Sequence, residues 1–159
     1  MGKSAEIIKI LKQAFPGLNA DKDFKLTSPA TPNYNCIAWA YQKDDQWMQP
    51  PGGEAWYDGV TFWPDGASKT TEVNSLIEAF QTKGYEICDS ENYEFGFMKV
   101  ALYWDSDSKK WTHAARQHRD GTWTSKLGRG NDIQHGTPHT IEGDNYGVVY
   151  CIMKRKVEF

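Results

Sequence analysis

The sequence predicts an α+β fold, in which helices come first and an antiparallel sheet follows. In the first half of the chain, apolar residues recur at helical spacing, as they do in residues 73–80. In the second half, short apolar runs are separated by turn residues, and an Asp-Gly pair at positions 120–121 is typical of a hairpin. Helices and strands do not alternate along the chain, which argues against a parallel βαβ sheet.

The first expected helix covers residues 4–15. Ser4 can cap its start, its apolar residues fall on one face, and a Pro-Gly pair ends it. Residues 18–35 then lack a sustained period and contain two prolines, so we expect a long loop, and loops of this length in a compact domain usually serve a function. A second, apolar helix is expected to begin at Cys36.

Residues 44–69 are irregular and rich in aromatic and turn residues. We expect Trp47, Trp56 and Trp63 in this region to line a substrate cleft. A cross-packed surface loop fits the same composition equally well.

A third helix is expected to open at Thr70 or Thr71 and to stop at Gly84. The pattern then changes to strands, which we expect at residues 97–104, 111–118, 123–127 and 146–153. The whole chain, residues 1–159, is thus expected to form a single domain with helices packed on an antiparallel sheet of about four to six strands.

The composition excludes several classes of function. A net charge of −3, with no basic run beyond residues 154–156, argues against nucleic acid as a partner. No apolar run approaches the length of about 18 residues that a membrane helix needs, and residues 1–14 resemble an amphipathic helix rather than a signal peptide. We therefore expect a cytoplasmic protein that does not bind a membrane. Nothing in the sequence implies a cofactor.

A metal site is not expected either. The three cysteines are too far apart for a disulfide framework or a CxxC site. His135 and His139 would share one face of a helix, but a glycine and a proline between them argue against a helix, and the glutamate of a zinc-protease motif is missing.

Cys36 is the strongest candidate for chemistry. At the start of a helix, unpaired backbone N–H groups and the helix dipole favour negative charge and can lower the pKa of a thiol below its free value of about 8.5. The alternative is that Cys36 is a buried, inert side chain. A nucleophilic thiol also needs a base, and His113, which two small alanines follow, is the best placed of the four histidines.

A cysteine that opens an early helix and a histidine that opens a later strand resemble the papain-like superfamily, and more narrowly its NlpC-type branch of cell-wall peptidases and amidases. The sequence also resembles a family of small, uncharacterised, mainly bacterial proteins. The shared signatures, within about residues 31–155, are Asn35-Cys36-Ile37-Ala38-Trp39-Ala40, Thr112-His113-Ala114-Ala115, residues 123–128 with 133–135, and residues 142–147. The resemblance implies a papain-like fold and a third polar residue, on or near the next strand, that orients the histidine.

Two residues compete for this third position. The position in the NlpC-type branch falls on Ser125. However, a two-residue turn at the Asp-Gly pair would put Gly128 opposite His113 and point Lys126, not Ser125, to the face of His113. A shift of one residue would exchange the two faces. A charged lysine offers no acceptor, so it is poorly suited to orient the histidine. We therefore expect His135, in a glycine-bounded loop, to accept the Nδ1–H of His113, with Ser125 as the alternative.

These residues predict a cysteine-dependent hydrolase or acyltransferase that acts on an amide, such as a peptide, an isopeptide or a peptidoglycan crosslink. Cys36 would attack the carbonyl, and His113 would take and return the proton. The Cys36 backbone N–H and a donor from Asn35 or Tyr34 would stabilise the oxyanion, and Lys126 would line the substrate cleft. The rival prediction is a catalytically inactive papain-like module that binds a partner through the aromatic loop.

Overall fold

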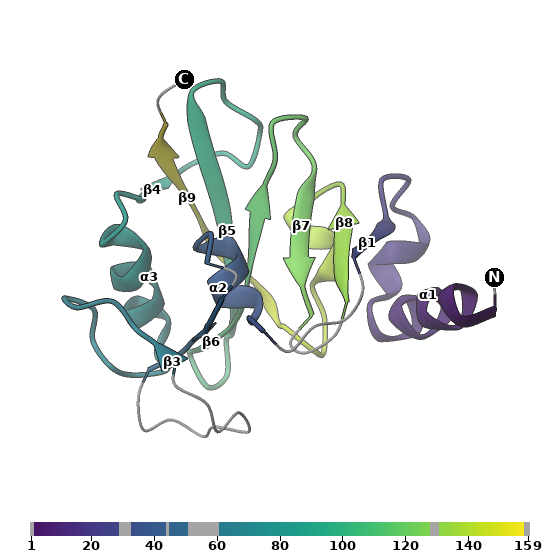
Figure 1. Ribbon diagram of the computed structural model, residues 1–159, viewed down its shortest axis with the longest axis horizontal. Helices are drawn as coiled ribbons and strands as arrows, with labels where there is room; N and C mark the ends of the chain where they lie inside the picture. Colours follow the sequence, from purple (N-terminus) through teal and green to yellow (C-terminus); the bar gives the residue numbers. More distant parts are fainter. Residues whose placement is uncertain (1, 29–32, 44, 51–60, 128–130, 158–159) are drawn as a thin grey trace.

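A computed structural model describes residues 2–28, 33–43, 45–50, 61–127 and 131–157. Seven strands form one sheet in the order β1-β8-β7-β6-β5-β9-β4, and each neighbouring pair is antiparallel (Figure 1). The strands are β1 (Lys25–Ser28), β4 (Glu86–Cys88), β5 (Phe97–Asp105), β6 (Lys110–Gln117), β7 (Trp123–Lys126), β8 (Asp132–His135) and β9 (Val148–Lys156). The α+β class with an antiparallel sheet is confirmed, but the predicted strand count was too low.

The strands that the sequence did not reveal are the short ones. β1, β4 and β8 have four, three and four residues, too few to show an alternating pattern. They form because a longer neighbour is already in place: β8 pairs with β7, β1 adds to β8, and β4 adds to β9. A separate parallel pair, β2 (Trp47–Met48) and β3 (Thr61–Phe62), lies in the region expected to be irregular.

The helices are α1 (Gly2–Ala14), α2 (Cys36–Ala40) and α3 (Val73–Gln81), with 3-10 turns η1 (Pro16–Asn19) and η2 (Pro138–Ile141). In Figure 1, α2 crosses in front of β5 and β6, α3 lies beside it, and α1 lies at the far end beyond β1. The third helix begins later than the threonines predicted to open it. No helix within the described ranges is long and apolar enough to cross a membrane.

Two separate hydrophobic clusters hold these layers together. On one face, α2 and α3 bury residues such as Ile37 and Phe80 against Leu102 of β5. On the other face, η1 and η2 bury residues such as Leu18 against Tyr103 of β5 and Trp123 of β7. Successive strand residues thus point to opposite clusters. Each fully buried large apolar side chain contributes about 1.5–3 kcal/mol to folding.

The hairpin between β6 and β7 differs from the prediction in one decisive detail. Gln117 pairs with Trp123, the N–H of His118 donates to the carbonyl of Thr122 (2.8 Å), and Gly121 has a φ of +87°. This is a three-residue loop, residues 119–121, that ends in a left-handed glycine. The predicted two-residue turn was wrong, and the register of β7 is shifted by one residue.

Candidate active site

Cys36 is the first residue of α2, and Asn35 caps the helix directly before it. The Asn35 Oδ1 atom accepts hydrogen bonds from the N–H groups of Ala38 (3.0 Å) and Met48 (3.1 Å), and its Nδ2 donates to the carbonyl of Met48 (3.0 Å). The cap therefore also ties α2 to β2. Because most of its amide is already bonded, Asn35 has at most one side-chain N–H left for the predicted oxyanion contact.

Burial controls the chemistry of the Cys36 thiol. Only 8% of the residue is exposed, and this burial raises the pKa of the thiol to about 11. Backbone N–H groups of Ala114 and Ile37 and the charge of Lys126 lower the pKa, but by less. The lowered pKa predicted from the helix start was wrong, since a five-residue helix does not offset the desolvation. Cys36 is therefore a neutral thiol at pH 7.

A hydrogen-bond chain links His113 to the end of β8. Ser125 Oγ lies 3.0 Å from His113 Nε2 and 2.8 Å from His135 Nε2, and His135 Nδ1 lies 2.8 Å from the carbonyl oxygen of Thr137. That carbonyl can only accept, so His135 carries its proton on Nδ1 and its Nε2 accepts from the Ser125 hydroxyl. Ser125 in turn accepts from His113 Nε2–H. The chain thus fixes the tautomer of His113.

The other ring nitrogen of His113, Nδ1, is therefore an acceptor. It is buried and has no hydrogen-bond partner among the described residues. The ring stacks on Tyr146, with centroids 4.0 Å apart and planes 10° apart, and meets the edge of Tyr103 at 5.2 Å. Burial lowers the pKa of His113 well below its usual value and lowers the pKa of His135 to about 4, so both are neutral at pH 7.

The structure brings both candidates for the third position into this chain. Ser125 contacts His113 directly, and His135 acts on it through Ser125. His135 lies in a strand rather than in the predicted loop, and it does not accept the Nδ1–H of His113. Because the hairpin loop has one more residue than predicted, Ser125 faces His113, whereas Lys126 faces the α2 side of the sheet.

Cys36 and His113 share two neighbours. One is Ala114, which follows His113 in β6 and whose N–H favours the Cys36 thiolate. The other is Tyr146, which stacks on the His113 ring and whose pKa is raised by burial and by the negative charge of an ionised Cys36. No hydrogen bond joins the thiol to His113 within the described part of the chain. Cys36 packs in the cluster on the α2 face of the sheet, whereas His113 contacts Tyr103 and Tyr146 of the cluster on the other face. The two side chains therefore start from opposite faces of β6.

Lys126 and Tyr34 form a charged layer next to the thiol. Lys126 is fully buried, its Nζ lies 5.5 Å from the centre of the Tyr34 ring, and its charge lowers the pKa of Cys36. The Tyr34 hydroxyl donates to Asp132 Oδ2 (3.0 Å), and the ring stacks on Trp39. The prediction of an oxyanion donor from Asn35 or Tyr34 named no atom, and the Tyr34 hydroxyl is engaged with this carboxylate.

Residues 25–154 match a family model described as "Domain of unknown function (DUF7689)". The chain belongs to this family. No curated protein and no solved structure matches it. The match covers α2 and the strands of the large sheet, except the last two residues of β9, and with them every side chain of the hydrogen-bond chain.

Of the tryptophans predicted to line a cleft in this DUF7689 domain, Trp47 and Trp63 lie within the described residues. Trp47 is 1% exposed and belongs to the buried interior, so its assignment to a cleft wall was wrong. Trp63 is half-buried, stacks on Trp111 and donates from Nε1 to the carbonyl of Ser68. Trp56 lies outside the described residues. Aromatic content alone does not distinguish a cleft wall from core packing.

No group of three or more His, Cys, Asp or Glu in the described ranges is arranged to hold a metal ion. His139 lies 3.1 Å from Glu91 and 3.1 Å from Glu142, and these carboxylates raise its pKa despite partial burial. His135 is engaged with Ser125 and Thr137 instead. The two histidines of the His-x-x-x-His spacing therefore have separate partners.

Sequence reasoning missed the roles of Tyr146 and Thr137. Tyr146 belongs to the shared signature at residues 142–147, which is a signal, but nothing in the residue types links it to His113. Thr137 acts through its backbone carbonyl, for which the side chain gives no signal. Chemically, the arrangement offers a thiol, a base with a fixed tautomer, and backbone N–H groups and an ammonium that favour negative charge at the sulfur.

Proposed function

We propose that this chain is a cysteine-dependent hydrolase or acyltransferase with papain-like architecture, which acts on an amide through Cys36 and His113. One observation carries the proposal: the hydrogen-bond chain leaves the buried Nδ1 of His113 as an unpaired acceptor, on a ring stacked with Tyr146, whose pKa the charge of an ionised Cys36 raises. The proposal requires the thiol to reach this nitrogen past the backbone of β6. Leaving a buried polar atom unpaired costs about 1–3 kcal/mol of folding free energy, so an unpaired buried atom calls for an explanation. A role for Nδ1 as the general base of the thiol would explain it.

The reaction starts from neutral groups. The Cys36 sulfur attacks the carbonyl carbon of the amide, a C–S bond forms, and the thiol proton passes to His113 Nδ1. When the intermediate collapses, the C–N bond breaks and His113 returns the proton to the departing amine. Water, or an amine in an acyltransferase, then attacks the thioester, again giving a proton to His113, and Cys36 recovers its proton as it leaves.

Ser125 and His135 act in this scheme as positioning residues. They hold the proton of His113 on Nε2, so that Nδ1 is free to accept. When Nδ1 takes up the thiol proton, the ring becomes an imidazolium, which donates to Ser125 more strongly than the neutral ring does. The substrate class is a peptide, an isopeptide or a peptidoglycan crosslink, and the described residues favour none of the three.

One observation favours the second candidate, an inactive papain-like interaction module. The Cys36 thiol is buried, and its pKa is raised to about 11, as expected for a structural cysteine. In that case Cys36 contributes packing only, and its reactivity is independent of His113.

Acylation by p-nitrophenyl acetate distinguishes the two candidates. The proposal predicts acetylation of Cys36 at pH 7.5, located by mass spectrometry of the peptides, and its loss in Cys36→Ala. His113→Gln is expected to slow acetylation by about 10²–10⁴-fold, the usual contribution of a general base. Cys151→Ala is the matched control, because it removes another thiol whose pKa is raised by burial, to about 12.

Unfolding in urea establishes that each variant is folded before its rate is compared. Acetylation of Cys36 at the same rate in the parent protein and in a folded His113→Gln variant would refute the proposed base. An inert Cys36 in the folded parent protein, at pH values up to 9, would favour the interaction module.

A further inference from the structure

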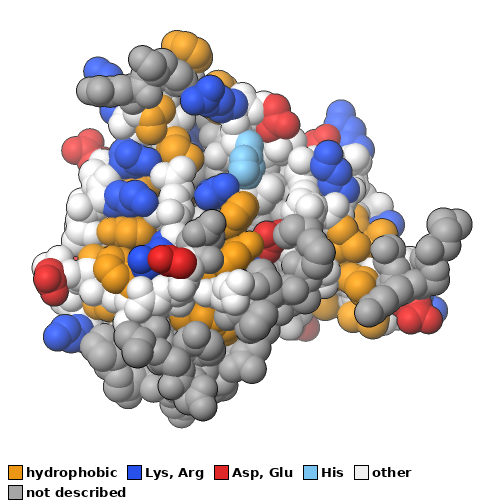
Figure 2. Space-filling model, viewed as in Figure 1, with side chains coloured by type: hydrophobic (Ala, Val, Ile, Leu, Met, Phe, Trp, Pro, Cys, Tyr) orange, Lys and Arg blue, Asp and Glu red, His pale blue; other side chains and the backbone are white. Residues whose placement is uncertain are grey.

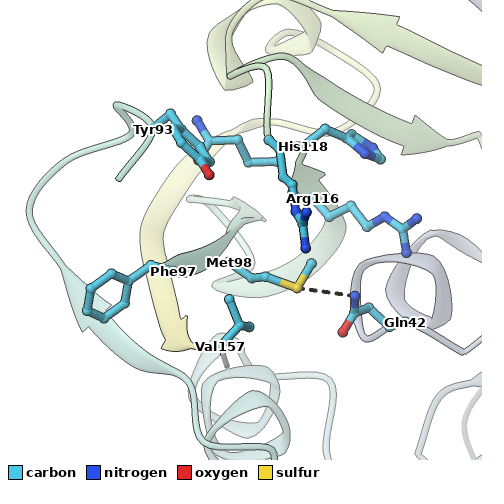
Figure 3. Close-up of a pocket in the computed structure, with 9 residues that line it drawn as sticks. Gln42, Tyr93, Phe97, Met98, Arg116, His118 and Val157 are labelled. Carbon is cyan, nitrogen blue, oxygen red and sulfur yellow. Dashed lines mark hydrogen bonds between the residues drawn. The ribbon is translucent and has the colours of Figure 1, made fainter. Parts of the chain in front are cut away.

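A hollow of about 520 Å³ lies beside the end of α2, separate from the candidate active site. Its lining includes neither Cys36 nor His113. In Figure 3, Tyr93 and His118 lie above it, Val157 lies below it, Phe97 lies to the left with its ring directed outward, and Gln42 reaches it from the end of α2. The hollow is therefore built from β5, β6 and the segments that precede β5 and follow α2, β6 and β9.

One part of the lining is cationic. Arg116 and Arg119 contribute the charge, and none of the nine lining residues is an aspartate or a glutamate. The imidazole of His118 lies beside them, with Nε2 2.6 Å from Thr124 Oγ1. Arg116 is held in place, because its guanidinium lies 3.6 Å from the centre of the Trp39 ring and donates to the Trp39 carbonyl (3.3 Å). A guanidinium fixed in this way loses little entropy when it binds an anion.

The cationic side chains around the hollow create a positive electrostatic potential, which lowers the pKa values of their basic neighbours. The pKa of His118 is lowered by burial and by the charge of Arg116, and Asp120 opposes this only in part. The pKa of Lys83 is also lowered, by burial and by three neighbouring cations that include Arg116. Figure 2 shows Lys and Arg side chains interspersed with hydrophobic ones on the face that carries α2 and α3. This face attracts anions although the protein as a whole carries a net negative charge.

Another part of the lining is apolar, while Gln42, Gln117 and Tyr93 add polar groups. Phe97, Met98 and Val157 form this part, and Gln42 donates from Nε2 to the Met98 sulfur (3.2 Å). An inorganic ion would leave this surface unused. A ligand that fits both parts carries an anionic group at one end and an apolar or aromatic group at the other.

We propose that this hollow binds a phosphate monoester of an aromatic or apolar group. One guanidinium already satisfies the two oxygens of a carboxylate, whereas two guanidinium groups and an imidazole match the dianion and three oxygens of a phosphate monoester. The phosphate lies against Arg116, Arg119 and His118, and the organic group lies against Met98 and Val157. This binding does not depend on the Cys36 thiol.

Calorimetric titration with 1-naphthyl phosphate tests the proposal. We expect saturable binding to the parent protein, at least about tenfold tighter than that of 1-naphthoate or of neutral 1-naphthol. Arg119→Gln is expected to weaken binding of the phosphate about tenfold or more. Lys22→Gln is the matched control, because it removes the same charge from an exposed site outside the lining and is expected to leave the affinity unchanged.

Met98→Glu provides a second variant, which places a carboxylate in the hollow and is expected to abolish binding of the phosphate. Thermal unfolding shows whether each variant is folded. No saturable binding to the parent protein, equal affinity for 1-naphthoate, or equal losses in Arg119→Gln and Lys22→Gln would each overturn the proposal. Unchanged binding in Cys36→Ala is expected, and it separates this site from the proposed hydrolase.

Discussion

Ser125→Ala is the sharpest test of the hydrogen-bond chain. The substitution removes two hydrogen bonds, of 3.0 Å to His113 and 2.8 Å to His135, at a site where all three residues are fully buried. It leaves one N–H donor and one ring-nitrogen acceptor without partners, and each such group costs about 1–3 kcal/mol. We expect a loss of about 3 kcal/mol in the free energy of unfolding, which lowers the melting temperature by about 6–12 °C for a domain of this size.

Urea unfolding, with the slope held common between variants, measures this loss. Ser108→Ala, in an exposed turn, is the matched control and is expected to change the free energy of unfolding by less than about 0.5 kcal/mol. Imidazole nitrogen chemical shifts provide an independent readout, because the parent protein should show His113 protonated on Nε2. A loss from Ser125→Ala no larger than that of the control, or a His113 protonated on Nδ1, would refute the deduced chain.

Two further predictions concern the same region. Asn35→Ala removes the cap of α2 and leaves the N–H and C=O of Met48 without their partner, so urea unfolding should show a loss of about 2–4 kcal/mol; a loss below about 1 kcal/mol contradicts the proposed cap. The pKa of His135 is about 4 in the folded protein and about 6.5 when unfolded, so the unfolded chain takes up the proton first as the pH falls. Urea unfolding at pH 7 and pH 5 should therefore show a loss of about 2 kcal/mol from His135, to which His113 adds in the same direction. Equal or greater stability at pH 5 would contradict neutral, buried histidines.

The pattern of residues was sufficient for the long elements of the fold but not for their register. β5, β6, β7 and β9 were predicted at nearly their observed positions, because apolar runs between turn residues mark them. The loop length of the hairpin was predicted wrongly because the Asp-Gly pair occurs in both two-residue and three-residue loops. A two-residue type I′ turn requires positive φ at both central positions, whereas only Gly121 has it here, since Asp120 does not. A difference of one residue was enough to exchange Ser125 with Lys126.

The candidate site shows the same limit in its electrostatics. The sequence placed Cys36 at a helix start and selected His113, Ser125 and His135, and the three polar residues do lie in one chain of hydrogen bonds. The pKa of Cys36 was predicted wrongly from the sequence, because the burial of the thiol depends on side chains that are distant from it in the sequence. The position of Trp47 was predicted wrongly for the same reason, since tertiary contacts decide where an aromatic residue of an irregular segment packs.

The opposite effects of burial on Cys36 and His113 constrain any mechanism at this site. Burial raises the pKa of the thiol and lowers that of the imidazole, so a thiolate–imidazolium pair is unfavourable in the free protein. In the proposed reaction, the proton therefore moves only as the C–S bond forms, when the charge leaves the sulfur for the carbonyl oxygen. Under this condition the resting pKa of Cys36 matters less than the availability of a bare nitrogen at the moment of attack. Ser125 and His135 provide that nitrogen by fixing the tautomer of His113, and for this reason the hydrogen-bond chain, rather than the thiol alone, defines the site.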